Sequence, residues 1–199
     1  TVSVSGQTAI LRMQADLRND SDSPHSVTFT LWLGDQSGHV VVAPRSRTVA
    51  IAAHGDYHLT QESSLSHPQL WSPATPSLYQ ACLRVRTGHR PVDHAKTYFG
   101  VRTIAVSAAR GFELNGVPLK LDGGNVHDDN GPLGDAAFAA AEFRRAELLK
   151  AAGFNAVRTA HNPPSPAFLD ACDRLGLLVI DEAFDGWVKP KQPHDYSAY

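Results

Sequence analysis

The sequence has few cysteines and no long apolar run. Its 199 residues include only two cysteines, Cys82 and Cys172, and their positions match neither the spacing of a zinc site nor a disulfide framework. We therefore predict that both are buried as small hydrophobic residues. No apolar run approaches the roughly 20 residues that a bilayer-spanning helix needs, so a membrane is not an expected partner.

An excess of charge of one sign is also missing. The 18 basic and 20 acidic residues give a formal net charge of -2, which provides no electrostatic reason to expect nucleic acid as a partner. Phosphate-binding patterns are absent as well, because the segment DGGNVHDDNG (122–131) contains glycines but fits neither G-x-G-x-x-G nor the P-loop. We expect no organic cofactor.

The first half of the chain is built from short alternating segments. Apolar and polar residues alternate in TAILRMQADL, SVTFTLWL, SRTVAIAA, YHLTQESSL and YQACLRVRT, and turn-rich pieces separate these segments. Several short strands at this spacing, without a helical period, favour an antiparallel β-sandwich of immunoglobulin-like type, which takes about 100 residues. We predict this domain over residues 1–104, with Trp32 and Trp71 in its core or at a domain interface.

From Gly111 the pattern changes to alternating strands and helices. The sequence predicts strands over VPLKLDG (117–123), NAVRTA (155–160) and LLVIDEA (177–183), with helices over 135–153 and 165–176 that end at glycines. This order, with continuous apolar strands, is typical of βαβ units and a parallel sheet. Residues 105–199 are therefore predicted to form a second, α/β domain.

Polar residues follow each of the three predicted parallel strands. They are His127 and its neighbours after the first, Arg158, His161 and Asn162 after the second, and Asp181, Glu182 and Asp185 after the third. In a βα barrel these positions share the edge on which active sites are built. A full barrel takes about 250 residues, so we expect only the first three of eight units here, as part of a longer protein.

Four longer motifs carry a family resemblance. LWSPATPSLY, FGVRTI, GFELNGVPLKLDGGNVHDDNGPLG and ELLKAAGFNAVRTAHNPPSPAFLDACDRLGLLVIDEAFD occur in this order between Leu70 and Asp185. Together they resemble glycoside hydrolase family 2, and within it the β-galactosidase-like members. The resemblance implies an immunoglobulin-like sandwich followed by the start of a (β/α)8 TIM barrel. It also implies a retaining exo-β-glycosidase that removes terminal β-linked sugars from oligosaccharides.

The resemblance implies roles for four residues at the predicted edge. His127 and His161 are expected to contact the sugar, which suits a neutral imidazole because it both donates and accepts hydrogen bonds. Asn162 is expected to bind substrate beside them. Arg158 is expected to orient carboxylates, which its planar fork holds bidentately. The structural alternatives are a backbone-bonded loop histidine for His127 and an ion pair with Glu182 for Arg158, and this ion pair is compatible with the orienting role.

The two catalytic carboxylates of the family are not expected in this chain. A retaining glycosidase uses an acid/base and a nucleophile about 5 to 5.5 Å apart, and the resemblance places both glutamates after later barrel strands. Asp181 and Glu182 cannot form that pair, because adjacent strand residues point to opposite faces. We therefore assign neither of them a direct catalytic role.

Three further positions affect the expected site. Asp128 stands where close relatives often have histidine, which changes the local hydrogen bonds. Trp187 could stack on a sugar ring or pack at the rim, and the sequence favours neither. No metal site is expected, because Phe184, Asp185 and Gly186 replace the glutamate-containing segment that binds Mg²⁺ in some family members.

Alternative functions stay open at this point. β-Glucuronidase and β-mannosidase activities occur in the same family, and their discriminating residues lie mostly downstream. A non-catalytic module that binds glycan or a protein partner is the alternative from another class. Homo-oligomer formation by the parent protein also stays open.

Overall fold

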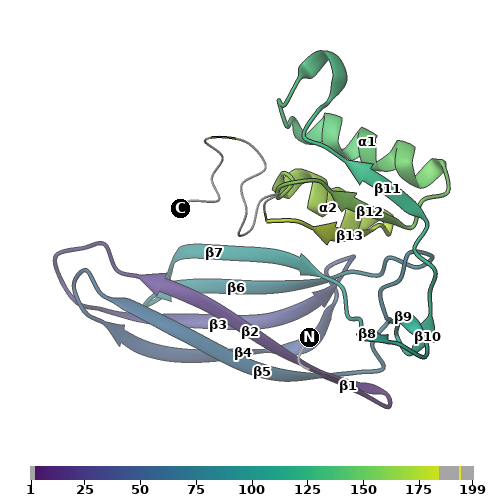
Figure 1. Cartoon of the computed structure of the whole chain (residues 1–199). Coiled ribbons are helices and arrows are strands. Elements are labelled where there is room, and N and C mark those ends of the chain that lie inside the picture. The colour runs from purple at the N-terminus through teal and green to yellow at the C-terminus, as the bar shows by residue number, and fades with distance from the viewer. Residues whose placement is uncertain (1–2, 184–192, 194–199) are drawn as a thin grey trace. The chain divides into compact units, whose positions relative to one another are not determined.

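The computed structural model describes residues 3–183 and 193, and these fall into two compact units (Figure 1). The sandwich unit comprises Thr1–Trp71 and Ser77–Val117, and the α/β unit comprises Ser72–Pro76 and Pro118–Tyr199. This division falls after Val117, whereas the predicted domain boundary lies between residues 104 and 105 and stays a prediction. Within the described residues, no helix has both the length and the apolar character needed to cross a membrane.

Two antiparallel sheets form the sandwich unit and confirm the predicted β-sandwich. One sheet has the strand order β1-β2-β5 and the other has the order β4-β3-β6-β7. The strands are β1 (Ser3–Ser5), β2 (Thr8–Arg18), β3 (His25–Asp35), β4 (Val40–Ile51), β5 (Asp56–Ser66), β6 (Tyr79–Thr87) and β7 (Arg90–Phe99). The alternating segments correctly predicted five of these strands, and only β1 and β7 were missed.

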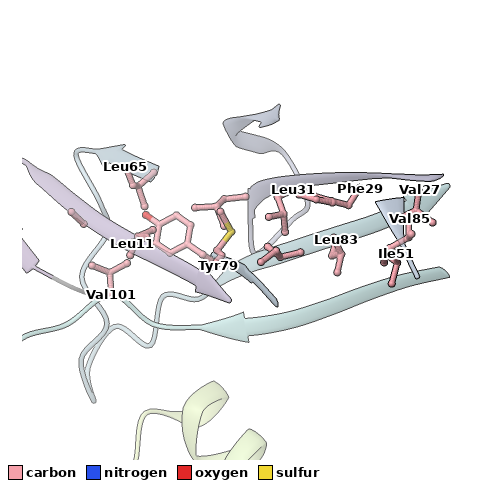
Figure 2. Packing of buried hydrophobic residues seen from close by; sticks show 14 residues of the cluster. Leu11, Val27, Phe29, Leu31, Ile51, Leu65, Tyr79, Leu83, Val85 and Val101 are labelled. Atoms are coloured by element: carbon pink, nitrogen blue, oxygen red, sulfur yellow. The ribbon is translucent and has the colours of Figure 1, made fainter. Parts of the chain in front are cut away.

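The core of the sandwich follows from the two-residue period of its strands. On β3 the side chains of Val27, Phe29 and Leu31 are buried, whereas the residues between them are not. All three belong to one buried cluster, in which Figure 2 shows Leu11, Leu65 and Tyr79 at one end and Val27 beside Val85 and Ile51 at the other. The alternation of inward and outward side chains therefore places one apolar layer between the two sheets.

The predictions for tryptophan and cysteine were partly correct. Trp71 is fully buried, and the guanidinium of Arg102 lies 4.7 Å from its ring centroid. Both cysteines are free, and Cys172 is buried as predicted. Cys82 is only partly buried. On β6 the side chain of the next residue, Leu83, points into the core. Because side chains alternate along a strand, the side chain of Cys82 lies on the outer face of the sheet.

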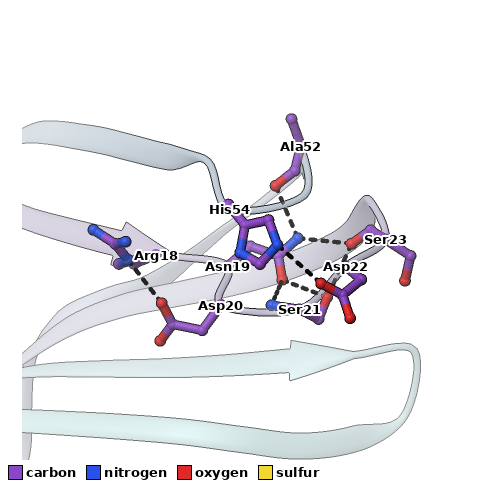
Figure 3. A network of polar contacts seen from close by, with 8 residues as sticks. All are labelled: Arg18, Asn19, Asp20, Ser21, Asp22, Ser23, Ala52 and His54. Carbon is purple, nitrogen blue, oxygen red and sulfur yellow. Dashed lines mark hydrogen bonds and ion pairs between the residues drawn. The ribbon is translucent and has the colours of Figure 1, made fainter.

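A loop network closes one end of the sandwich (Figure 3). The side-chain amide of Asn19 donates to the carbonyl oxygens of Ser23 and Ala52, each at 2.9 Å, and its Oδ1 accepts from the backbone N–H and hydroxyl of Ser21. The exposed pair His54–Asp22 adds a contact of 3.0 Å between Nε2 and Oδ1. One asparagine thus holds two loops that lie far apart in the sequence.

A small sheet with the order β10-β9-β8 completes the sandwich unit. Its strands are β8 (Ile104–Ser107), β9 (Gly111–Leu114) and β10 (Val117–Pro118). Asn115, with a φ of 54°, forms the turn after β9 and donates from its side chain to the carbonyl oxygen of Trp71 at 3.0 Å. This bond fixes the turn against the buried tryptophan.

The α/β unit contains three parallel strands and two helices, as predicted. In chain order the elements are β11 (Gly123–Val126), the 3-10 turn η1 (Gly131–Leu133), α1 (Ala139–Ala151), β12 (Ala156–Thr159), α2 (Pro166–Leu175) and β13 (Leu178–Asp181). The strand order is β11-β12-β13, and both pairings are parallel. This succession of βα units is the start of a TIM barrel.

The first parallel strand lies later in the chain than predicted. VPLKLDG was expected to form it, but Val117–Pro118 of that segment belongs to the small sheet, and the parallel strand begins only at its last residue and spans Gly123–Val126. The glycines explain the difference. A Cβ on Gly123 would lie 1.8 Å from the carbonyl oxygen of Ala156 on β12, so the strand needs glycine there to pair.

Helix α2 ends as predicted, whereas α1 begins four residues later and ends two residues earlier than predicted. Phe138 is still extended, so α1 starts at Ala139 and not at residue 135. Helix α2 starts where the hydroxyl oxygen of Ser165 accepts from the N–H of Phe168, and it ends at Gly176, whose φ of 78° is left-handed. A second core of helix residues, including Ala146 and Phe168, packs against the β12 residue Val157.

The short segment Ser72–Pro76 is fixed to the α/β unit by helix α1. The ammonium group of Lys150 donates to the carbonyl oxygen of Pro73 at 2.6 Å and to that of Gly176 at 2.8 Å. Burial lowers the pKa of Lys150 from its ordinary value. The two carbonyl groups nonetheless give the buried amine hydrogen-bond partners.

Candidate functional site

The carboxyl ends of β11, β12 and β13 lie at one edge of the parallel sheet, as predicted. The strand register pairs Asn125 with Arg158 and Arg158 with Ile180, so these three side chains share one face. The opposite face carries Val157, which packs against the helices. Polar side chains thus gather on the face away from the helices and at the edge where the strands end.

Arg158 is the centre of this polar face. Its Nε donates to Oε1 of Glu182 at 2.8 Å, its Nη2 lies 2.6 Å from the same oxygen, and its Nη1 donates to Oδ1 of Asn125 at 3.3 Å. The structural alternative considered for Arg158, an ion pair with Glu182, is therefore present. These hydrogen bonds and the positive charge hold the pKa of Glu182 below its ordinary value of 4.5.

His161 joins the same carboxylate. Its Nδ1 lies 3.4 Å from Oε2 of Glu182, and the peptide bond that links it to Ala160 is cis. The ring of His161 meets the ring of His127 edge to face, with 5.7 Å between their centroids. Because a carboxylate only accepts hydrogen bonds, it favours a proton on Nδ1 and leaves Nε2 of a neutral ring as an acceptor.

Asn162 links the loops that follow β11 and β12. Its Nδ2 donates to Oδ2 of Asp128, the residue next to His127. Because the carboxylate can only accept, the amide nitrogen must face it, and Oδ1 of Asn162 is turned elsewhere. The structure thus brings together all four predicted site residues, His127, Arg158, His161 and Asn162, and their roles in binding stay predictions.

Two contacts at this edge were not foreseen from the sequence. Asn125 was not considered, although strand register would have placed it beside Arg158 had β11 been located correctly. The bond from Asn162 to Asp128 was also missed, because nothing in the sequence fixes which loop residues meet. The predicted positions Asp185 and Trp187 lie outside the described residues.

Other reactive side chains do not extend the site. Burial raises the pKa of Cys172 to about 12, so its thiol stays protonated near neutral pH. Across residues 3–183 and 193, no three His, Cys, Asp or Glu side chains gather as metal ligands. The imidazole, amide and guanidinium groups at this edge can hydrogen-bond a polar ligand, such as a polyhydroxyl compound.

Comparison with known families decides the identity of the chain. Residues 1–102 match the sequence model of Glycosyl hydrolases family 2, and residues 104–190 match that of Glycosyl hydrolases family 2, TIM barrel domain. The chain belongs to glycoside hydrolase family 2. Each half of this family 2 chain thus matches the domain predicted for it, the sandwich and the start of the barrel.

Individual relatives of this family 2 chain include two kinds of glycosidase. It is 40% identical over 199 residues to the β-galactosidase BoGH2A of Bacteroides ovatus, covering 100% of this chain and 23% of that protein. A solved structure of a family 2 member from Bacteroides cellulosilyticus aligns with a TM-score of 0.87 at 43% identity, covering 97% of this chain and 25% of that one.

A β-glucuronidase is similarly close in structure. The crystal structure of Bacteroides uniformis β-glucuronidase aligns with a TM-score of 0.88 at 28% identity, covering 96% of this chain and 23% of that protein. The chain therefore spans about a quarter of the length of the relatives that it matches. The two relatives that are named for an activity, a β-galactosidase and a β-glucuronidase, act on different sugars.

Proposed function

We propose that this chain supplies the sandwich and the first barrel strands of a retaining exo-β-glycosidase that removes terminal β-galactosyl residues from oligosaccharides. The observation that carries the proposal is the convergence of His127, His161 and the Arg158–Glu182 pair at the carboxyl edge of β11, β12 and β13. This is the edge at which barrel enzymes bind substrate.

Each group has a task that its geometry supports. His161, with Nδ1 directed at Glu182, offers Nε2 to a sugar hydroxyl, and His127 offers a second imidazole beside it. Asn162, whose amide nitrogen is engaged by Asp128, offers Oδ1 as an acceptor. Arg158 keeps Glu182 ionised and so fixes the ring of His161.

The chemistry itself needs two further carboxyl groups. A retaining enzyme protonates the leaving oxygen with one carboxylic acid while the second attacks the anomeric carbon to form a covalent intermediate. Later barrel strands of the complete enzyme would supply both groups. The residues of this chain would bind and orient the sugar between them.

β-Glucuronidase is the second candidate activity. The observation in its favour is the TM-score of 0.88 with Bacteroides uniformis β-glucuronidase. The galactosidase is preferred because the alignment with the Bacteroides ovatus β-galactosidase covers 100% of the chain at 40% identity, whereas the alignment with a putative β-glucuronidase of Formosa agariphila covers 73% of it at 41% identity.

The test is hydrolysis of nitrophenyl β-galactoside, β-glucuronide and β-mannoside by the complete natural polypeptide that contains this chain. We expect the galactoside to be cleaved fastest, and His161→Ala to lower kcat/KM on it by about a hundredfold through the loss of a sugar contact. His89→Ala, in the exposed turn between β6 and β7, is the matched control. Cleavage of none of the three sugars would overturn the proposal, and faster cleavage of the glucuronide would replace it with the second candidate.

A further inference from the structure

Helix α1 carries a buried ion pair for which the proposed chemistry has no use. Nη2 of Arg145 lies 2.6 Å from Oε2 of Glu142, and the side chains are only 16% and 3% exposed. Removing two charges from water carries a large cost, which is offset only where geometry and further hydrogen bonds are good. Such a pair in an otherwise Ala-rich helix therefore calls for a physical explanation.

Both residues of this ion pair form hydrogen bonds with the loop that follows β11. Nη1 of Arg145 donates to the carbonyl oxygen of His127 at 2.8 Å and to that of Asp129 at 3.4 Å. Oε1 of Glu142 accepts from Nδ2 of Asn130 at 2.9 Å. The loop at residues 127–130 is thus held at three points by two residues of one helix turn.

The guanidinium of Arg145 is itself held in place by packing. Its central carbon lies 4.7 Å from the ring centroid of Phe168, a fully buried residue of α2. A planar group stacked in this way has little freedom to turn, so its fork can face the carboxylate of Glu142 and the carbonyl oxygen of His127 together. A lysine could not serve both partners with the same rigidity.

The imidazole of His127 has no comparable support of its own. Among the described residues, its ring contacts the ring of His161 but makes no hydrogen bond. The position of this imidazole therefore depends on the backbone that carries it. That backbone is the one to which Arg145 donates.

We propose that Arg145 and Glu142 are positioning residues for sugar binding, which act by fixing the backbone of His127. The inference rests on the proposed function, since it assigns the pair a role in that same site. Neither residue touches the sugar. Their effect on activity passes entirely through the loop.

The test combines Arg145→Lys with His127→Ala in the complete natural polypeptide, with nitrophenyl β-galactoside as substrate. Arg145→Lys keeps the charge but loses the fork, and we expect kcat/KM to fall by about tenfold or more, as for other small displacements of a binding group. In the His127→Ala background, Arg145→Lys should change kcat/KM little further. Arg174→Lys is the matched control, because Arg174 lies on α2 and its Nε donates to Oδ2 of Asp170 at 2.8 Å.

Additive losses in the double variant would overturn the proposal, because they would mean that Arg145 acts independently of His127. Unchanged activity in Arg145→Lys would overturn it as well. Hydrogen exchange provides a readout that needs no activity, since the amides of residues 127–130 should exchange faster in Arg145→Lys but not in Arg174→Lys. If the wild type cleaves no glycoside, the proposed function fails, and the exchange rates still decide whether Arg145 holds the loop.

Discussion

Replacing Gly123 with alanine tests how closely β11 must approach β12. The new Cβ would lie 1.8 Å from the carbonyl oxygen of Ala156 and 2.7 Å from its carbonyl carbon. Both atoms belong to backbone, and real Cβ atoms essentially never come within 3.0 Å of another heavy atom. The strands would therefore have to separate by about 1.2 Å, the difference between 3.0 and 1.8 Å, which stretches a hydrogen bond beyond its useful range.

The size of the effect follows from two contributions. Overpacking of this kind costs about 1 to 3 kcal/mol, and one weakened ladder hydrogen bond adds about 1 kcal/mol. We therefore expect Gly123→Ala to reduce the free energy of unfolding by about 2 to 4 kcal/mol. Urea unfolding followed by circular dichroism should show this as a lower midpoint with an unchanged slope.

The neighbouring glycine provides the matched control. The atom nearest to a Cβ on Gly124 would be Cε2 of Phe154, at 3.8 Å, which is an ordinary van der Waals contact. Gly124→Ala should therefore be neutral or stabilising by up to about 1 kcal/mol, because alanine restricts the unfolded chain. Equal losses in the two variants, or a neutral Gly123→Ala, would refute the argument from close approach.

Two further predictions concern charge and loop structure. Because Arg158 lowers the pKa of Glu182, this carboxylate adds stability above about pH 4.5 and loses it as the pH falls through its folded pKa. Glu182→Gln should therefore lower Tm at pH 7, and the difference from wild type should close in thermal melts as the pH falls through the lowered pKa of Glu182. Asn19→Ala removes the hydrogen bonds to Ser23 and Ala52 and should lower the free energy of unfolding in urea by about 1 to 3 kcal/mol. The control Asp22→Ala, at a fully exposed carboxylate, should leave the free energy of unfolding almost unchanged.

The parts of the fold that were predictable are those in which burial sets the sequence pattern. Strand β3 shows this plainly, because its buried and less buried positions alternate over most of its length. Strand β7 was missed because eight of its ten residues are exposed, so neither face selects apolar residues. Backbone pairing with β6 places β7 in the sheet. This pairing does not require an alternation of apolar and polar residues, so the sequence of β7 shows none.

The first parallel strand was misplaced for a different reason. GGNV has little apolar character, and glycine normally disfavours strands. The tight approach to Ala156 makes glycine a requirement at this point, so a tertiary contact overrides the local preference. His127 was nevertheless correctly predicted to follow the first parallel strand, because the observed strand ends at Val126, still before His127.

In the candidate site, the shared edge of the sheet was predictable and the connections between its side chains were not. Parallel strands place their carboxyl ends together whatever the residues are, so His127, Arg158 and His161 could be grouped from the strand pattern. The contacts from Arg145 to the loop depend on the rotation of helix α1 and on a backbone carbonyl group. Neither is encoded at any single position of the chain.

The bond between Asn162 and Asp128 bears on how this enzyme family could be re-engineered. Loops at the carboxyl edge of a barrel are commonly treated as exchangeable units, because each follows its own strand. Here the first and second loops share a hydrogen bond and a histidine ring contact, so a graft of either loop alone would leave unmatched partners in the other. The two loops therefore depend on each other structurally, and grafting experiments should transfer them together.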